Sequence, residues 1–343
     1  MNALCDTDGL CARNVVARKD RHVHKEKHFV RLRSQSLKSF DKLKKVPTPE
    51  TTPSVILFFI DGLGIGDAGD NNPLSSIPNI EPLSVYKGMT DQVFMSGTLV
   101  STDPRLGVEG RPQSASGQTA ILTGQNAPQI LGFHKQGFPN EKLREVIAKH
   151  SIFRKLDELK VGPNVFVNAY TPRFFSSTPR WKSATTCSVE ASNLQFRRLP
   201  DLVGRKALFH DFTNESLIAG GLAVSQFTPN DAAEILAEFT RNYRFILYEH
   251  FITDKIGHDM DRERAHLHLP LLAEFIRKTL SRIDLSNTTF LLTSDHGNIE
   301  DLSIRNHTLN DVPTIVWGRN RNETATRIKD LTDITPAIIS LLT

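Results

Sequence analysis

Residues 288–298 read TTFLLTSDHGN, and this stretch decides the fold because an apolar run ends directly in metal-binding groups. Its first half is typical of a buried strand. Asp295 and His296 follow that strand at once, with Gly297 and Asn298 behind them. In open α/β sheets, ligands bind beyond the carboxyl ends of the strands. The stretch therefore predicts a site at one edge of a sheet.

The same arrangement recurs in other parts of the chain. Asp61 follows the apolar run SVILFFI at 54–60, and Asp254 and His258 follow RFILYEHF at 244–251. His307 precedes another apolar run, VPTIVWG at 312–318. We expect these runs to be strands that deliver their polar followers to one place.

Helical patterns alternate with the expected strands. EKLREVIAKH (141–150) and SIFRKLDELK (151–160) repeat apolar residues at three- and four-residue spacing, and TPNDAAEILAEFTRNY (228–243) has a Thr-Pro helix start. A further helix is expected in DITPAIISLL (333–342) and another strand in NVFVNAY (164–170). This alternation predicts an α/β layer fold with a mostly parallel sheet.

Composition limits the classes of protein to consider. The chain has 343 residues, 39% of them hydrophobic, which can fill a sizeable core. Its three cysteines include no CxxC pair, so neither a disulfide framework nor a thiolate zinc site is supported. No run of 18 apolar residues or signal-peptide pattern is present, and we expect a cytoplasmic protein without a membrane segment.

Charge is uneven along the chain. Residues 1–50 hold twelve Lys/Arg and six Asp/Glu, and VPTPETTP follows at 46–53 as a linker. We interpret residues 1–51 as a basic, disordered arm and linker, and we expect no nucleic-acid partner. Residues 135–210 are also basic, with fourteen Lys/Arg and six Asp/Glu.

Six carboxylate and imidazole side chains form the candidate ligand set. They are Asp61, Asp254, His258, Asp295, His296 and His307. Mixed oxygen and nitrogen ligands suit Mn²⁺ or Zn²⁺, whereas Mg²⁺ and Ca²⁺ prefer oxygen. Six ligands are too many for one catalytic ion, so we expect two ions roughly 4 Å apart that could share a phosphate.

The segment RPQSASGQTAILTG at 111–124 offers a nucleophile. Ser114, Ser116 and Thr119 lie where a small-residue turn leads into a helix. The positive end of a helix favours a bound phosphate, and a divalent ion can activate a hydroxyl. The same residues would also serve as simple helix caps, and local sequence alone does not choose.

The ordered motifs resemble the alkaline phosphatase superfamily of two-metal enzymes, most closely the branch of cofactor-independent phosphoglycerate mutase and phosphopentomutase. The matching motifs are Asp61-Gly62-Leu63-Gly64, Asp254-Lys255-Ile256-Gly257-His258, Asp295-His296-Gly297-Asn298 and His307-Thr308 with Val312-Pro313. The resemblance covers residues 54–128 and 244–343. It implies a three-layer α/β/α core with a mostly parallel sheet and a smaller inserted cap.

The resemblance also implies residue roles. One ion would bind Asp254, His258 and His307, and the other would bind a set formed by Asp61, Asp295, His296 and Ser114. Ser114 alone has the family's spacing to two glycines, Gly117 and Gly124. Gly297 would permit a tight turn, and Asn298 would orient a ligand. The mutase pattern Asn-Ser-Glu-x-Gly-His is changed here to Gln113-Ser114-Ala115-Ser116-Gly117-Gln118.

The resemblance predicts the domain organisation as well. The core would comprise 52–129 and 231–343, and 130–230 would be the inserted cap or substrate segment. Its basic residues are candidates for gripping an anionic substrate. The five candidates are Arg173, Arg180, Lys182, Arg205 and Lys206.

The predicted function is two-metal phosphotransfer on a small phosphorylated metabolite through a phosphoserine on Ser114, as a phosphomutase (an isomerase) or a phosphatase (a hydrolase). Three alternatives stay open: a metal-binding relative without turnover, a phosphodiesterase- or sulfatase-type hydrolase, and a nucleic-acid-binding protein led by the basic arm. The substrate, the native metal and the oligomeric state stay open too.

Overall fold

A seven-stranded sheet organises the computed structural model, in the order β2-β3-β9-β8-β1-β7-β4. Five of its strands run in the same direction, and β9 and β2 run against them. The strands of the sheet are β1 (Ser54–Ile60), β2 (Gln92–Val93), β3 (Gly97–Thr102), β4 (Asn164–Phe166), β7 (Phe245–His250), β8 (Thr288–Thr293) and β9 (Val312–Gly318). The prediction of a mostly parallel sheet is confirmed.

The structure describes residues 52–89, 92–177, 181–192 and 194–343. The predicted basic arm, residues 1–51, and the candidate Arg180 lie outside these ranges. Within the described residues, no helix is both long and apolar enough to span a bilayer.

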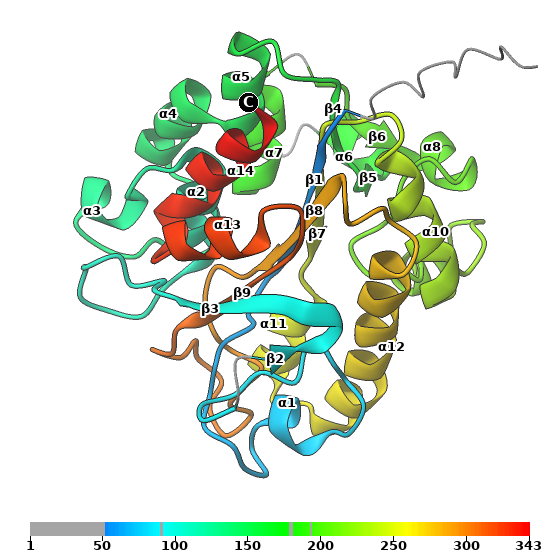
Figure 1. The fold of residues 1–343 in the computed structure, drawn as a ribbon. Coiled ribbons are helices and arrows are strands. Elements are labelled where there is room, and N and C mark those ends of the chain that lie inside the picture. Colours follow the sequence, from blue (N-terminus) through cyan, green and yellow to red (C-terminus); the bar gives the residue numbers. More distant parts are fainter. Residues whose placement is uncertain (1–51, 90–91, 178–180, 193) are drawn as a thin grey trace, which may run out of the picture. The chain divides into compact units, whose positions relative to one another are not determined.

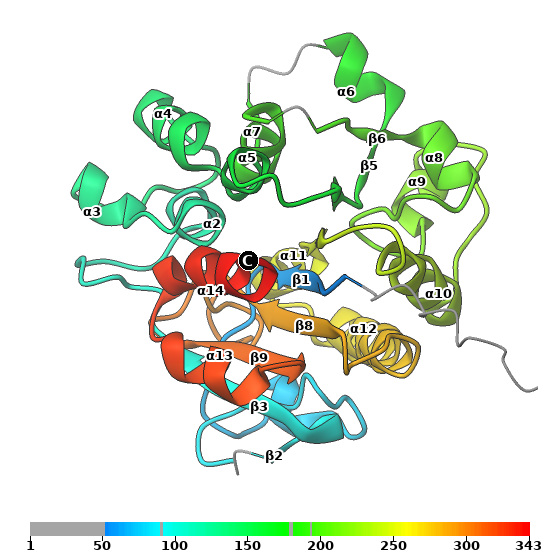
Figure 2. The same cartoon turned by 45° about the horizontal axis from the view of Figure 1, so that its top comes forward.

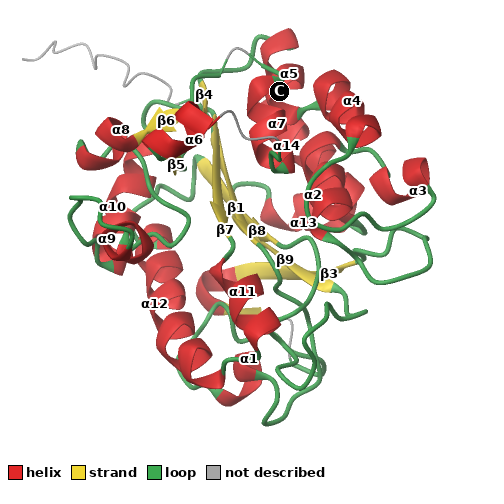
Figure 3. Ribbon diagram, turned by 180° about the vertical axis from the view of Figure 1, so that it is seen from behind, coloured by secondary structure: helices red, strands yellow, loops and turns green. Residues whose placement is uncertain are grey.

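Helices cover both faces of the sheet, as Figures 1 and 3 show. One layer contains α2 (Ser114–Thr123), α3 (Ala127–Leu131), α4 (Glu141–His150), α5 (Ile152–Glu158), α7 (Ala184–Glu190), α13 (Arg321–Arg327) and α14 (Ile334–Leu342). The opposite face is covered by α10 (Pro229–Phe239) and α12 (Arg262–Leu280). The predicted three-layer core is therefore confirmed.

The strand β1 shows why the sheet is covered on both sides. All seven of its residues are buried, and alternate side chains enter different cores. Phe58 packs with Tyr248 and Phe275 on the α12 side, whereas Leu57 and Phe59 belong to the core beneath α2 and α14. Because both faces of β1 are apolar, the strand reads as a continuous hydrophobic run.

The remaining elements lie around the ends of the sheet. They are α1 (Pro73–Ser76), α6 (Pro172–Ser177), α8 (Leu199–Val203), α9 (Glu215–Ala219), α11 (Ile252–Asp259) and a two-stranded sheet of β5 (Ala169–Tyr170) and β6 (Arg197–Arg198). The expected strand at 164–170 is thus two strands in different sheets. The helix α2 begins at Ser114, within the segment 111–124 where a turn into a helix was expected.

Parts of residues 130–230, the expected cap segment, contribute to the core. The described residues from 52 onward form one compact unit, and β4 pairs with β7 at the edge of the main sheet. The helices α4 and α7 pack on α2, because their apolar faces complete that layer of the core. In Figure 2, β5, α6, β6, α8 and α9 lie away from the main sheet. A cap role for that smaller part stays a prediction.

Candidate active site

The predicted ligand residues meet beyond three neighbouring parallel strands. Asp61 follows β1, Asp254 lies in the first turn of α11 just after β7, and Asp295 and His296 follow β8. Since the sheet order is β8-β1-β7, the carboxyl ends of these strands lie side by side. His307 reaches the same place from the loop between β8 and β9.

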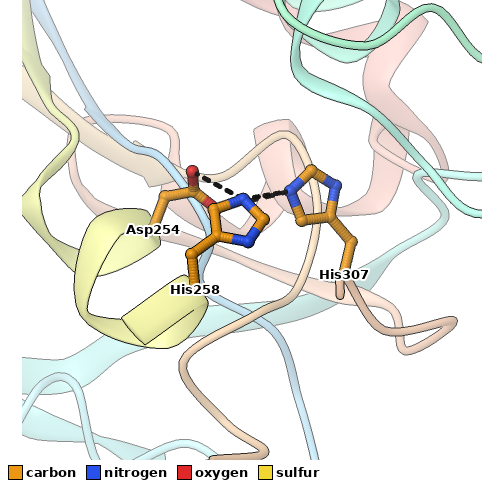
Figure 4. Close-up of side chains that lie close together, drawn as sticks. All are labelled: Asp254, His258 and His307. Carbon is orange, nitrogen blue, oxygen red and sulfur yellow. Dashed lines mark hydrogen bonds and ion pairs between the residues drawn. The ribbon is translucent and has the colours of Figure 1, made fainter. Parts of the chain in front are cut away.

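Asp254, His258 and His307 form one group that could hold a metal ion (Figure 4). The two imidazole Nε2 atoms lie 3.1 Å apart. His258 Nε2 is 3.4 Å from Asp254 Oδ2, and His307 Nε2 is 3.5 Å from Asp254 Oδ1. Three donor atoms from two segments of the chain thus face a common point.

The hydrogen bonds of these two imidazoles favour metal binding. His258 Nδ1 lies 2.7 Å from the carbonyl oxygen of Arg305, and His307 Nδ1 lies 2.9 Å from that of Pro112. A carbonyl oxygen only accepts, so each Nδ1 carries a proton, and the Nε2 atom is the one that can offer a lone pair to a cation. Two lone pairs and a carboxylate that converge in this way suit a divalent cation.

Asp61, Asp254 and His296 form a second group. His296 Nε2 lies 3.3 Å from Asp61 Oδ1 and 3.5 Å from Asp295 Oδ2. Asp61 Oδ1 and Asp295 Oδ1 are buried without a hydrogen-bond partner. Buried carboxylate oxygens of this kind require compensation, and a bound cation would supply it. Asp254 belongs to both groups, which the sequence did not predict.

The pKa values of these groups reflect the crowding of charge. Burial and the neighbouring Asp295 raise the pKa of Asp61 well above its usual value, and burial and Asp254 raise that of Asp295 to about 7. Burial lowers the pKa of His296 to about 3, so the imidazole is neutral. A cation bound beside this neutral imidazole would favour the ionised form of the two carboxylates. It would therefore oppose the rise in their pKa values.

Ser114 is the first residue of α2, and its Oγ lies 2.9 Å from His296 Nε2. The two other candidate hydroxyls face their own backbone instead. Ser116 donates to the Gln113 carbonyl oxygen and Thr119 donates to that of Ala115. Of the three candidates, Ser114 is therefore the one whose hydroxyl lies against the ligand set.

Two amide side chains hold the carboxylates in place. Gln118 Nε2 donates to Asp61 Oδ2 at 3.1 Å and to Asp295 Oδ2 at 3.2 Å. Asn298 Nδ2 donates to Asp254 Oδ1 at 2.8 Å, which is the ligand-orienting contact expected for Asn298. Sequence analysis did not assign Gln118 to the site. Its position four residues after Ser114, on the same face of α2, was the available signal.

A buried glutamate, Glu300, joins the loops around the ligands. Its carboxylate accepts from the backbone N–H groups of Gly64 and Asn298 and from the side chains of Thr308 and Asn310. Sequence analysis missed it, although it lies two residues beyond the DHGN motif. A carboxylate with four donors fixes the loop after β1 relative to the loop between β8 and β9, and ties two parts of the latter loop together.

The glycines beside Glu300 are explained by close packing. A Cβ on Gly64 or on Gly297 would lie 2.1 Å from Glu300 Oε1. Gly297 is not among the residues with positive φ, so the expectation that it serves a tight turn is replaced by a steric reason. The loops can approach Glu300 because neither position carries a side chain.

The predicted substrate-gripping cations are not gathered at the site. A cavity of about 460 Å³ is lined by Asp61, Ser114 and Asp254, and its lining includes none of the described candidates Arg173, Lys182, Arg205 and Lys206. Lys182 pairs with Glu190, and Arg205 pairs with Asp231 and Glu234. The cavity is instead lined by Lys255, inside the Asp-x-x-Gly-His motif. Net charge over a segment does not tell where its cations point.

A family of known proteins matches the carboxyl-terminal part of the chain. Residues 189–343 match the model of the metalloenzyme superfamily. The chain carries a domain of this alkaline phosphatase-like superfamily. The match includes Asp254, His258, Asp295, His296 and His307. The metalloenzyme domain confirms the predicted superfamily.

Two curated relatives and one solved structure are similar to the chain. A 2,3-bisphosphoglycerate-independent phosphoglycerate mutase of Ehrlichia canis (strain Jake) is 25% identical over 154 residues, and one of Antithamnion sp. is 30% identical over 109 residues. The matches cover 40% and 29% of this chain but only 30% and 21% of the relatives. The PH0037 protein of Pyrococcus horikoshii has a TM-score of 0.50 and 16% identity, with 85% of this chain and 97% of that chain covered. This last likeness concerns the fold.

Asp61 and Ser114 lie outside the residues matched by the superfamily model. Their assignment to the site therefore depends on the geometry: the contact of each with His296, and the contact of Asp61 with Gln118.

Proposed function

We propose that the chain is a two-metal phosphotransfer enzyme, a phosphomutase or a phosphatase, that acts on phosphate monoesters through Ser114. The observation that carries this proposal is the 2.9 Å contact between Ser114 Oγ and His296 Nε2. A capping serine would use its oxygen on backbone groups, as Ser116 does with Gln113 and Lys135.

The donor set fits two divalent ions, for which Mn²⁺ and Zn²⁺ are the proposed identities. One position would be formed by Asp254, His258 and His307, and the other by Asp61, Asp295 and His296 with Ser114 beside them. When bound, such ions polarise phosphate oxygens and favour the alkoxide form of a serine hydroxyl. Asp254, which belongs to both groups, would lie between the two positions.

The reaction proposed for this chain has two steps. Ser114 Oγ loses its proton and attacks the phosphorus, a serine O–P bond forms, and the bond from phosphorus to the substrate alcohol breaks. The departing oxygen takes up a proton. In the second step the serine O–P bond breaks as the phosphoryl group passes to water in a phosphatase, or to another hydroxyl of the substrate in a mutase; the attacking oxygen gives up its proton and Ser114 Oγ regains one. The positive end of α2 favours the phosphate next to Ser114, and Lys255 lies in the same cavity.

A screen of phosphate monoesters tests the proposal. The chain is stripped with a chelator, reloaded with Mn²⁺ or Zn²⁺, and assayed separately for free phosphate and for isomerised ester. We expect turnover only in the reloaded samples, and the product ratio distinguishes hydrolysis from transfer within the substrate. Full activity in a preparation shown by elemental analysis to be free of metal would contradict the proposal.

A further inference from the structure

The cavity that holds Ser114 has a second set of lining residues with a different character. Besides Asp61, Ser114, Gln118 and Asp254, it is lined by six aromatic side chains. These residues, which we call the aromatic lining, are Phe138, Phe166, Tyr170, Phe174, Phe209 and Phe251. A cavity of about 460 Å³ has room for an organic group larger than a short polyol chain.

Ring contacts hold much of the aromatic lining in place. The Tyr170 and Phe174 ring centroids lie 4.4 Å apart. Phe209 and Phe251 pack on His210 from distances of 4.1 Å and 3.9 Å between ring centroids. Phe166 is almost completely buried. Rings already packed on one another lose little freedom when a flat ligand joins them.

The charges of the cavity argue against a substrate with a second anionic group. Lys255 is the one lysine or arginine among the lining residues that the structure describes. The carboxyl of Glu249 also lines the cavity and is only 8% exposed. A carboxylate or second phosphate on the substrate would meet Glu249 and the aromatic lining, and the one described cation there, Lys255, whose Nζ lies 4.7 Å from the Phe251 ring centroid, would be shared with the phosphate at Ser114.

We infer that the substrate is a phosphate monoester whose organic part carries a flat aromatic group with a hydrogen-bond donor, as a nucleoside does. This inference rests on the proposed function, because Ser114 must meet the phosphate. The aromatic lining would stack on the ring, and Glu249 would accept a hydrogen bond from its donor. Stacking of a base on aromatic side chains is worth a factor of about ten to a hundred in binding.

A matched pair of ligands tests the inference. Adenosine 5′-monophosphate and methyl ribofuranoside 5-phosphate have the same phosphate ester and differ in the base. Their dissociation constants are measured by calorimetry on Mn²⁺-loaded Ser114→Ala protein, so that binding is read without turnover. We expect the adenosine ester to bind about ten to a hundred times more tightly. Equal binding, or tighter binding of the methyl riboside, would overturn the inference.

Two adjacent phenylalanines provide the variant and its control. Phe174 lines the cavity, whereas Phe175 packs on Phe196 and beneath Arg198 and is not part of the lining. In the same Ser114→Ala background, Phe174→Ala should lower the preference for the adenosine ester several-fold and leave binding of the methyl riboside within about twofold. Phe175→Ala should keep the preference. If Phe175→Ala loses the preference and Phe174→Ala keeps it, the assignment of Phe174 to the binding of the base is wrong.

The proposed function and this inference fail in different ways. If the unaltered protein turns over both esters and binds them equally, the phosphotransfer proposal stands and the inference of an aromatic substrate is wrong. A binding preference without any phosphorylated Ser114 would retain the aromatic site and reject the serine mechanism.

Discussion

The ligand residues and the aromatic lining of the cavity are built in opposite ways. Asp61, Asp254 and Asp295 come from the ends of three adjacent strands, and amide hydrogen bonds hold their carboxylates. The aromatic lining comes from loops and short elements spread over residues 138–251. Under the function proposed above, the sheet would supply the chemistry and the chain between α2 and α11 would select what the chemistry acts on.

Among the substitutions that test this comparison, we expect the largest effect on metal occupancy and turnover from a change at Asp254. Because Asp254 belongs to both metal groups, Asp254→Ala should lower occupancy at both positions and reduce turnover by roughly a thousandfold or more. His258 belongs to one group and is the matched control: His258→Ala should affect one position. Elemental analysis and ion titration of the two variants check this. Loss of a single ion in both variants would show that Asp254 is not shared.

Glu249 provides a test on the aromatic side of the cavity, because its carboxyl group lies among the aromatic side chains there. Burial raises its pKa to about 7, against a partial opposing effect of a hydrogen bond from Thr185. The folded protein then holds a proton between pH 4.5 and 7 that the unfolded chain releases, so the free energy of unfolding falls as pH rises through this window. The free energy of unfolding is about 3 kcal/mol lower above the folded pKa than it is well below the unfolded pKa.

Urea unfolding at pH 5 and pH 8, with chelator present, measures this effect. Glu249→Gln cannot titrate, so relative to the unaltered protein it should gain about 2.5 kcal/mol between the two pH values, slightly less than the whole effect because pH 5 lies above the unfolded pKa. A difference between the two proteins that is independent of pH would mean that Glu249 ionises normally in the folded state.

A smaller effect is expected where an amide orients a ligand. Asn298 donates to Asp254 Oδ1, and loss of such a contact lowers metal affinity or activity about ten- to a hundredfold. Asn298→Ala should therefore weaken metal binding while it preserves the ratio of the two ester affinities. Titration of the stripped variant with Mn²⁺ provides the measurement. Unchanged metal affinity would exclude an orienting role for Asn298.

The sequence predicted the ligand side of the cavity better than the aromatic side, for physical reasons. A buried strand is a recognisable apolar run, and Asp61 or Asp295 directly after such a run must lie at the edge of the sheet. Asn298 was foreseen from its motif. Gln118 could have been found from its place four residues after Ser114 on the same face of α2. Glu300 and the shared place of Asp254 depend on which segments meet, and no local pattern encodes that.

The aromatic lining could not be predicted because its residues gather only through tertiary packing. Phe138 lies in a loop and Phe174 in the short helix α6, so neither has a periodic pattern that marks a cavity. The positions of the candidate cations could not be foreseen for a related reason. Lys182 and Arg205 were chosen by charge, and their carboxylate partners Glu190, Asp231 and Glu234 are visible only in the structure.

The most direct test of the central claim is to find which residue receives the phosphoryl group. The Mn²⁺-loaded protein is incubated with a ³²P-labelled substrate ester, quenched in acid, and its labelled peptide is mapped by mass spectrometry, with Ser116→Ala as a control for the adjacent hydroxyl. We predict label on Ser114, loss of label and of turnover in Ser114→Ala, and retention of both in Ser116→Ala. Label on Ser116 or Thr119, or undiminished turnover in Ser114→Ala, would contradict the account.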